Sequence, residues 1–308
     1  MGKTAFLFAG QGSQYPGMGR ELYELRAEVR ELFSAAEQIR PGTLAQMFDG
    51  TEDELRRTDN TQPCLFLADL AAAVALEAAG ISADVTAGFS LGEIAALAQA
   101  GVLGAENAFR LVCRRGSLMQ AAAERETGSM IAVLRMDAAE LEALCAENDV
   151  YPVNYNCPGQ IVVSGRKEAT EAVKAALAER GVRFVELAVG GPFHTPYMAP
   201  ASESLREVLR GMPLRAPRIP LYANRTALPY PEESTGIAVT AAEQICNPVR
   251  WEDTLRRMAA DGVDTFIECG PGKTLAGFVK RTVPGATIFG VSDAASLAAC
   301  TEALAARA

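Results

Sequence analysis

The segment Gly88-Phe89-Ser90-Leu91-Gly92 restricts the fold of this chain more than any other part of its 308 residues. It has the form G-x-S-x-G and lies between residues 85–89, predicted to be a strand, and residues 91–100, predicted to be a helix. In such a sharp turn the glycines give clearance, and the serine hydroxyl projects at a helix N-terminus. A glycine-rich turn without chemistry is the alternative. A strand that leads directly into a helix indicates an α/β domain.

The predicted elements around this turn follow an α/β order. The apolar run at residues 4–8 predicts a first strand, and residues 63–79 predict a helix after it. Strand, helix, strand, helix in this order indicates a mostly parallel sheet. Further along, the order becomes β-α-β-β-α-β, which is typical of a ferredoxin-like unit. We therefore expect a large α/β domain formed by residues 1–126 and 193–308, with a small domain at residues 127–192 inserted in it.

Composition and charge exclude several classes of partner and cofactor. The net charge of −9 argues against nucleic acid as a partner. The chain has one histidine and seven cysteines, with no CxxC pair, so we expect no metal site. No stretch of about 18 apolar residues is free of charge, and residues 1–8 indicate a strand rather than a signal peptide. We therefore expect a cytoplasmic protein with reduced cysteines and no membrane association.

A serine nucleophile needs a base, and His194 is the only histidine in the chain. Glycine and proline flank it on both sides in the segment GGPFHTP at residues 190–196. Such a shaped loop, held by rigid elements, is a common place for catalytic groups. A capping or solvent-facing histidine is the alternative interpretation.

Two further features suggest a ligand site. The loop Gly10-Gln11-Gly12 follows the first strand but lacks the G-x-G-x-x-G spacing, so it suits a second oxyanion N–H better than a dinucleotide. Arg115 precedes Gly116 inside a predicted helix, where glycine costs about 1 kcal/mol relative to alanine. A glycine there suggests close packing or a ligand, and an arginine in a pocket can bind a carboxylate. A surface arginine like Arg114 is equally compatible with the pattern.

Eight motifs together resemble the malonyl-CoA:acyl carrier protein transacylases of fatty acid synthesis and the related acyltransferase domains of polyketide synthases. In chain order they are GQGSQ (10–14), TQP (61–63), GFSLGE (88–93), RGSLMQ (115–120), NYNCPGQ (154–160), GPFH (191–194), NPVRW (247–251) and GPGK (270–273). The resemblance covers nearly the whole chain and implies a hydrolase-like α/β domain plus a ferredoxin-like small domain.

The resemblance also implies a function. The enzyme would move malonyl from coenzyme A to the phosphopantetheine thiol of acyl carrier protein, through an ester on Ser90 in a ping-pong reaction. Malonyl-CoA is then a substrate and not a permanently bound cofactor, the carrier protein is a transient partner, and we expect a monomer. His194 is implied as the base, oriented by the backbone carbonyl of Gln244.

Four more site residues follow from the same resemblance. The backbone N–H groups of Gln11 and Leu91 are implied to form the oxyanion hole. Arg115 is implied to bind the malonyl carboxylate, and Gln62 to line the site. A basic docking patch for the acidic carrier protein is also expected, with Lys273, Lys280 and Arg281 as candidates or, alternatively, as an ordinary solvated helix face.

One position departs from the family pattern, because Phe89 stands where the family usually has histidine. Phenylalanine cannot donate a hydrogen bond, which favours a looser choice of acyl group. Phe193, by contrast, matches the malonyl-type version of its loop, and Arg115 is retained. The alternatives are a trans-acting polyketide synthase acyltransferase with a broader acyl range, a serine esterase, and a non-catalytic carrier-binding subunit. An esterase of the α/β-hydrolase kind has its histidine near the C-terminus, whereas here 114 residues (308 − 194) follow His194.

Overall fold

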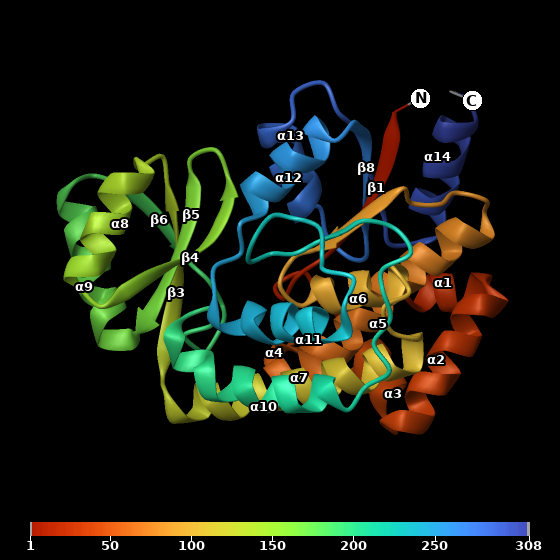
Figure 1. The fold of residues 1–308 in the computed structure, drawn as a ribbon, viewed down its shortest axis with the longest axis horizontal. Helices are drawn as coiled ribbons and strands as arrows, with labels where there is room; N and C mark the ends of the chain where they lie inside the picture. Colours follow the sequence, from red (N-terminus) through yellow and green to blue (C-terminus); the bar gives the residue numbers. More distant parts are fainter. Residues whose placement is uncertain (1, 307–308) are drawn as a thin grey trace.

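A five-stranded, fully parallel sheet forms the centre of the larger part of the molecule (Figure 1). The computed structural model describes residues 2–306. The strands are β1 (Lys3–Phe8), β2 (Val85–Gly88), β7 (Leu221–Tyr222), β8 (Val263–Cys269) and β9 (Thr287–Val291), in the order β7-β2-β1-β8-β9. Because neighbouring parallel strands end at the same edge, the residues that follow β1, β2 and β8 come together there.

Helices cover both faces of this sheet. They are α1 (Arg20–Leu25), α2 (Ala27–Ile39), α3 (Thr43–Asp49), α4 (Glu52–Arg56), α5 (Thr58–Ala78), α6 (Gly92–Gln99), α7 (Ala105–Arg125), α10 (Ala199–Arg210), α11 (Ser234–Glu243), α12 (Trp251–Ala260), α13 (Thr274–Thr282) and α14 (Ala294–Ala305), with short 3₁₀ turns η1 (Pro196–Met198) and η2 (Gln244–Cys246). Successive residues of β1 point to opposite faces, as expected for a strand. Phe6 and Phe8 pack with α5, α6 and α7, whereas Ala5 and Leu7 pack with α12 and α13.

A second, antiparallel sheet lies beside the first, at the left of Figure 1. It consists of β3 (Gly128–Leu134), β4 (Val150–Cys157), β5 (Gln160–Arg166) and β6 (Arg183–Glu186), in the order β4-β5-β3-β6. Helices α8 (Ala138–Glu147) and α9 (Lys167–Glu179) pack on it around their own apolar cluster. This is the β-α-β-β-α-β arrangement of a ferredoxin-like unit, so the predicted α/β fold class is confirmed.

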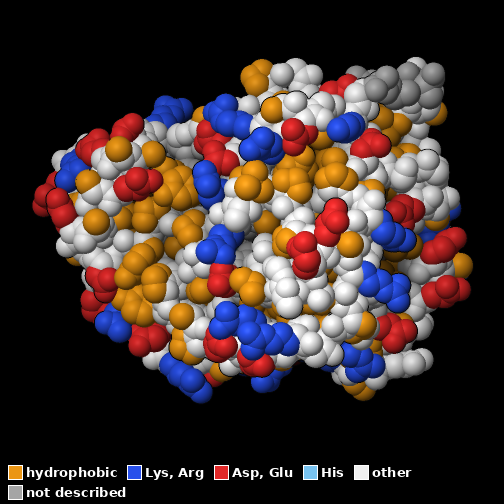
Figure 2. Space-filling view, viewed as in Figure 1, with side chains coloured by type: hydrophobic (Ala, Val, Ile, Leu, Met, Phe, Trp, Pro, Cys, Tyr) orange, Lys and Arg blue, Asp and Glu red, His pale blue; other side chains and the backbone are white. Residues whose placement is uncertain are grey.

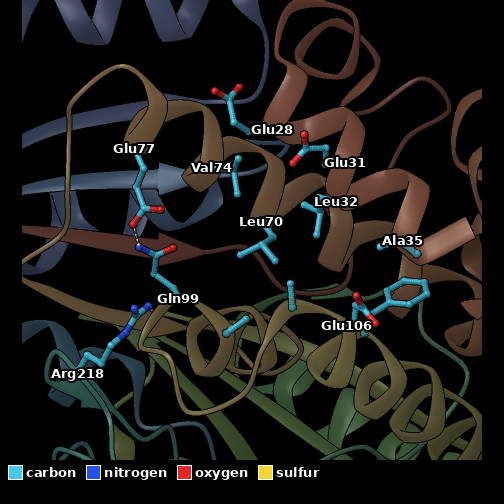
Figure 3. A pocket seen from close by; sticks show the side chains of 14 residues that line it. Glu28, Glu31, Leu32, Ala35, Leu70, Val74, Glu77, Gln99, Glu106 and Arg218 are labelled. Atoms are coloured by element: carbon cyan, nitrogen blue, oxygen red, sulfur yellow. Dashed lines mark hydrogen bonds between the residues drawn. The ribbon is translucent and has the colours of Figure 1, made fainter.

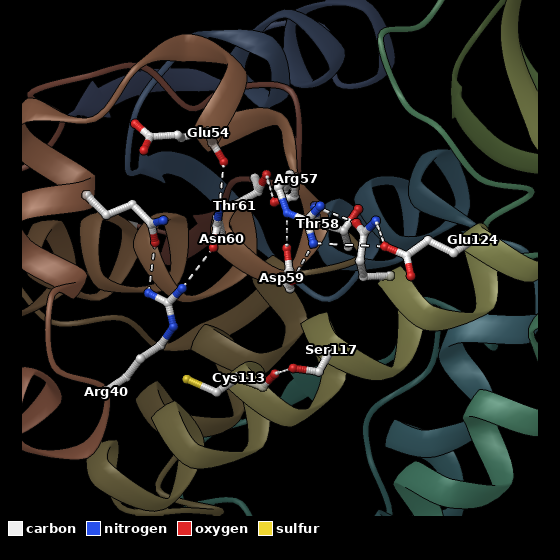
Figure 4. A network of polar contacts seen from close by, with 12 residues as sticks. Arg40, Glu54, Arg57, Thr58, Asp59, Asn60, Thr61, Cys113, Ser117 and Glu124 are labelled. Atoms are coloured by element: carbon white, nitrogen blue, oxygen red, sulfur yellow. Dashed lines mark hydrogen bonds and ion pairs between the residues drawn. The ribbon is translucent and has the colours of Figure 1, made fainter.

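The sequence predicted a helix that starts at Pro63, and this start was wrong. Helix α5 begins five residues earlier, at Thr58. Its first turn is held by partners outside the helical ladder (Figure 4). Gln120 Oε1 of α7 accepts the N–H of Thr58 at 3.1 Å, and Thr61 Oγ1 donates to the carbonyl of Arg57 at 2.9 Å. Of the helices in the described chain, α5 alone is long and apolar enough to cross a membrane, and 83% of its apolar window is buried inside the molecule.

Candidate active site

Ser90 lies at a strained turn between β2 and α6. Its φ angle is 51°, in the left-handed region that non-glycine residues rarely adopt. A Cβ atom on Gly88 would lie 1.9 Å from the backbone of Gly92, and one on Gly92 would lie 2.2 Å from the carbonyl of Phe8. Both positions therefore admit only glycine, and the turn directs the serine away from the sheet.

His194 comes from the loop before η1 and meets Ser90 across 104 residues of chain. Its Nε2 lies 2.7 Å from Ser90 Oγ, and its side chain is almost fully buried. Its Nδ1 lies 3.0 Å from the carbonyl oxygen of Gln244 and 3.2 Å from that of Asn247. Since carbonyls only accept, Nδ1 carries the hydrogen and Nε2 is free to accept the serine proton.

The His194 imidazole is neutral at neutral pH. Its burial, followed by the nearby positive charge of Arg115, lowers its pKa from 6.5 to about 4. The two carbonyls at Nδ1 act in the opposite direction but do not overcome this. A neutral histidine in contact with a hydroxyl can act as a general base.

Arg115 lies beside this pair and is 1% exposed. Its Nη1 donates to Gln62 Oε1 at 2.8 Å, and its Nη2 donates to Gln244 Oε1 at 2.8 Å and to Ser90 Oγ at 3.3 Å. Its Nε has no hydrogen-bond partner, and it forms no ion pair among the described residues. Burial lowers its pKa to about 10, so the guanidinium remains charged at neutral pH. The charge of Glu93 acts on Arg115 and raises its pKa, but no carboxylate pairs directly with the guanidinium, so this buried cation is prepared to bind an anion.

Gly116 explains how Arg115 reaches this position. A Cβ atom there would lie 3.1 Å from the carbonyl of Thr58 and 3.4 Å from Cβ of Gln62. The glycine thus lets α7 pack closely against the start of α5, which brings Arg115 against Gln62. Gln62 is fully buried, and its Nε2 lies 3.3 Å from Met119 Sδ.

Two residues hold the backbone of Ser90 from both sides. Asn224 Oδ1 accepts the Ser90 N–H at 2.7 Å, and Asn224 Nδ2 donates to the carbonyl of Gly88 at 2.6 Å. Gln244 Nε2 donates to the carbonyl of Ser90 at 2.6 Å. Asn224 and Asn247 were not among the predicted site residues, although Asn247 is the first residue of the NPVRW motif. A polar residue just beyond the carboxyl end of β7 was the available signal for Asn224.

Glu93 supports Asn224 from inside the protein. Its Oε2 accepts the backbone N–H of Asn224 at 2.9 Å, and its Oε1 accepts the hydroxyl of Tyr230. Burial raises the pKa of Glu93 to about 7, although its hydrogen bonds and the charge of Arg115 act against this. The serine turn is therefore tied to a buried polar network, which fixes its geometry.

A cavity of about 60 Å³ joins these residues. Its lining includes Gln11, Leu91, Phe89, Phe193 and Met119 together with the serine, histidine and arginine already described. Within the described chain, the backbone N–H groups of Gln11 and Leu91 donate to no protein acceptor. The structure thus brings all seven predicted site residues together and leaves two N–H donors free at the cavity.

Phe89 belongs to an aromatic group under the turn. Its ring centroid lies 5.3 Å from that of Trp251, edge to face, and 6.2 Å from that of Phe278. A Cβ atom on Gly10 would lie 2.9 Å from the Phe89 ring, so the phenylalanine also contacts the loop after β1. Phe89 therefore both packs under the turn and lines the cavity.

A larger cavity of about 350 Å³ lies elsewhere, among residues of α2, α5, α6 and α7 (Figure 3). Its polar lining includes Glu28, Glu31, Glu77, Glu106 and Arg218, and it contains no serine, histidine or cysteine. We therefore place the chemistry in the smaller cavity. Among residues 2–306, no group of three or more His, Cys, Asp or Glu side chains is arranged to hold a metal ion.

The chain is similar to known acyltransferases. Residues 5–300 match the acyl transferase domain family. The malonyl CoA-acyl carrier protein transacylase of Bacillus subtilis strain 168 is 40% identical over 300 residues, which cover 95% of this chain and 94% of that one. The crystal structure of MCAT from Streptococcus pneumoniae superimposes with a TM-score of 0.92 at 38% identity, covering 98% of this chain and 100% of that one.

A solved complex of a type II polyketide synthase acyl carrier protein with its malonyl-transacylase is also similar. It has a TM-score of 0.93 at 36% identity and covers 98% of this chain and 99% of that one. Fold and sequence together therefore define an acyltransferase of the α/β class. Within that class, the chain belongs to the malonyl CoA-acyl carrier protein transacylase family, as its motifs predicted.

Proposed function

We propose that this enzyme transfers malonyl from coenzyme A to the thiol of an acyl carrier protein through an ester on Ser90. One observation supports this most strongly: His194 Nε2 and Arg115 Nη2 converge on Ser90 Oγ, at 2.7 and 3.3 Å. Nucleophile, base and an unpaired buried cation thus meet at one oxygen. A simple serine esterase has no need of that cation, whereas a malonyl carboxylate does.

In the first half-reaction, Ser90 Oγ attacks the thioester carbonyl while His194 Nε2 takes its proton. The backbone N–H groups of Gln11 and Leu91 bind the oxyanion. Each such donor contributes about 3 kcal/mol in comparable sites. The C–S bond then breaks, the coenzyme A sulfur takes the proton from His194, and the malonyl ester remains on Ser90.

In the second half-reaction, the phosphopantetheine thiol of the carrier protein replaces coenzyme A. His194 takes the thiol proton, and the sulfur attacks the ester carbonyl. Ser90 Oγ then leaves and recovers a proton from His194. Because coenzyme A leaves before the carrier protein enters, the scheme is ping-pong. The same protein groups serve both half-reactions, and neither needs a permanently bound cofactor.

Malonyl selection follows from Arg115. Its guanidinium pairs with the free carboxylate of the acyl group, while hydrogen bonds to the amide oxygens of Gln62 and Gln244 hold it in place. The carboxylate of a bound malonyl group also offsets the positive charge of Arg115, which lowers the pKa of His194. The correct substrate therefore makes the base stronger, and a neutral acyl group such as acetyl does not.

The carrier protein would dock on a basic surface, despite the net charge of −9. Figure 2 shows Lys and Arg side chains gathered over α12 and α13. Lys273, Lys280 and Arg281 are exposed there, and Arg281 also donates to the carbonyl of Pro158 at 2.8 Å. That bond places Arg281 at the boundary with the antiparallel sheet. An acidic partner fits this surface by charge.

We further propose the expected division into a large domain, residues 1–126 and 193–308, and an inserted small domain, residues 127–192. The separate apolar cluster around Ile131 and Val163 supports it. We also propose that the protein is cytoplasmic, since its cysteines are unpaired. We propose that it serves fatty acid synthesis, since its relatives are named as acting on acyl carrier protein, and that it is a monomer, as the family resemblance implies.

Intact-protein mass after brief incubation with acyl-CoA donors tests the donor specificity. Wild type should gain a malonyl adduct within seconds, and much less acetyl or methylmalonyl adduct. The Arg115→Ala variant should lose most of the malonyl adduct and keep or gain the acetyl adduct. Equal labelling of wild type by all three donors would contradict malonyl selection while keeping the serine chemistry.

A further inference from the structure

Asp69 is a buried acid that the mechanism above does not use. It lies in the middle of α5 and is 0% exposed. Neither of its carboxyl oxygens has a hydrogen-bond partner of normal geometry. A buried carboxyl without partners costs free energy, so a position of this kind calls for a reason.

Its surroundings place it beneath two loops at the carboxyl edge of the parallel sheet. The backbone N–H of Ala9, two residues before Gln11, faces the carboxyl group. A Cβ atom on Gly270, after β8, would lie 1.9 Å from Asp69 Oδ1. The two loops also meet directly, because a Cβ atom on Gly272 would lie 3.3 Å from Ser13 Oγ. Asp69 thus fills the space under the loop that carries Gln11.

The surroundings of the Asp69 carboxyl favour its protonated form. Burial and then the charge of Glu268 hold its pKa well above the usual range, against the smaller effect of the Ala9 N–H. Glu268 accepts the N–H groups of Leu275 and Ala276 at 3.1 and 2.8 Å, so α13 stabilises its charge. Burial raises the pKa of Glu268 as well, but these N–H groups oppose it, so Asp69 is the acid whose surroundings favour the protonated form more strongly.

The other titratable groups around Asp69 do not supply a positive charge. Cys269 lies on β8 next to it, and burial holds the pKa of that thiol well above its usual range. Cys300 of α14 and Glu77 of α5 act on Cys269 from further away. None of these groups is a cation that would favour ionisation of Asp69, which packs between the loops after β1 and β8.

We propose that Asp69, packed under the loops after β1 and β8, is a positioning residue that holds the Ala9–Gln11 loop so that the Gln11 N–H points at the reacting carbonyl. This rests on the proposed function, in which that N–H binds the oxyanion. Loss of one oxyanion donor lowers kcat by about 10²–10³ in comparable enzymes. A displacement of the Gln11 N–H by a fraction of a hydrogen-bond length should therefore also lower kcat, but by less.

Two substitutions separate positioning from a merely structural role. Asp69→Asn keeps the shape and the polar atoms, and should acylate Ser90 within about threefold of wild type. Asp69→Leu has similar size and no polar atom, and should lower kcat at least tenfold while leaving the KM for malonyl-CoA within about twofold. Because it removes an unpartnered carboxyl, Asp69→Leu should unfold at the same or a higher urea concentration. Asp53→Leu, at a carboxylate with an 87% exposed side chain, is the matched control.

The outcomes are distinct. If Asp69→Leu is as stable as wild type and acylates at the wild-type rate, the proposal is overturned. If wild type itself forms no Ser90 adduct, the proposed function fails first. If Asp69→Leu does not fold, the pH dependence of Ser90 acylation is compared between wild type and Asp69→Asn. Acylation by wild type should fall on the alkaline side as Asp69 ionises and the asparagine variant should not share that fall, whereas coincident profiles would overturn the proposal.

Discussion

Ser90 and His194 are both held with positive φ angles, 51° and 62°, while Ser90 Oγ lies 2.7 Å from His194 Nε2. Each such conformation costs about 1–3 kcal/mol for a residue with a Cβ atom. The surrounding hydrogen bonds over-determine both backbones: Asn224 binds the Ser90 N–H, and the N–H of His194 donates to the carbonyl of Ile245 at 3.1 Å. The fold therefore holds Ser90 and His194 in the contact that the proposed reaction needs before any substrate binds.

This strain predicts a difference between two inactive variants. Ser90→Gly and Ser90→Ala both remove the hydroxyl, but only glycine is relaxed at φ 51°. We expect Ser90→Gly to be more stable than Ser90→Ala by about 0.5–1 kcal/mol, after allowance for the greater freedom of glycine when unfolded. Urea unfolding followed by the fluorescence of Trp251, the only tryptophan, measures this. An alanine variant of equal or greater stability would show that the turn is not strained.

The single histidine allows a direct test of the electrostatics. Wild type should give one imidazole resonance in NMR, titrating at a pKa of about 4, well below the ordinary 6.5. Because the folded pKa is lowered, His194 contributes stability that is present above pH 6.5 and is lost as the pH falls towards 4.

Arg115→Gln should move that titration to higher pH, since it removes a cation that lowers the pKa of His194. The acidic limb of kcat/KM should move with it. A wild-type histidine that titrates near 6.5 would contradict the buried, cation-facing site, and Arg110→Gln on the exposed side of α7 should leave the value unchanged.

Gln244 contacts three residues of the proposed active site at once. Its backbone carbonyl binds His194, its side-chain Nε2 donates to the carbonyl of Ser90, and its Oε1 accepts from Arg115. Gln244→Ala keeps the first contact and loses the other two. We expect acylation by malonyl-CoA to fall by about 10- to 100-fold, from two lost hydrogen bonds of about 1 kcal/mol or more each. Quenched-flow acylation checks this, and a rate within threefold of wild type would show that the side chain is dispensable.

Phe89 supports the turn through packing. Phe89→Ala would leave a gap against Trp251 and Phe278, and we expect a loss of about 2–4 kcal/mol in the free energy of unfolding. Urea unfolding followed by circular dichroism measures it without relying on the altered environment of Trp251. Phe89→His restores the residue usual in the family and should narrow the acyl range if the aromatic ring has widened it. An unchanged ratio of malonyl to acetyl labelling would assign Phe89 to packing alone.

Much of the site could be predicted because it consists of short segments with restricted backbones. The glycines around Ser90 and His194 mark turns that the sequence displays directly, and one histidine leaves one possible base. The parallel order of strands then brings the residues after β1 and β2 to one edge. Those constraints are local or topological, so they are visible without coordinates.

The rest depends on contacts between distant residues. Helices α1–α4 between β1 and α5 were not predicted: α1, α3 and α4 have only five to seven residues each, and the buried faces of these helices arise from packing against distant parts of the chain such as α5. Pro63 was taken as a helix start, whereas Gln120 of α7 supplies the partner that lets α5 begin at Thr58. Asn224 binds Ser90 across 134 residues of chain, and the lack of hydrogen-bond partners around Asp69 is visible only in the folded structure.

The most direct test of the central claim follows one malonyl group through both half-reactions. Labelled malonyl-CoA is mixed with wild type and Ser90→Ala, the intact masses and the Ser90 peptide are measured, and holo-acyl carrier protein is then added. The proposed function predicts a malonyl ester on the Ser90 peptide of wild type, none in Ser90→Ala, and its quantitative transfer to the carrier thiol. An adduct that persists in Ser90→Ala, or a wild-type ester that water removes faster than the carrier does, would contradict it.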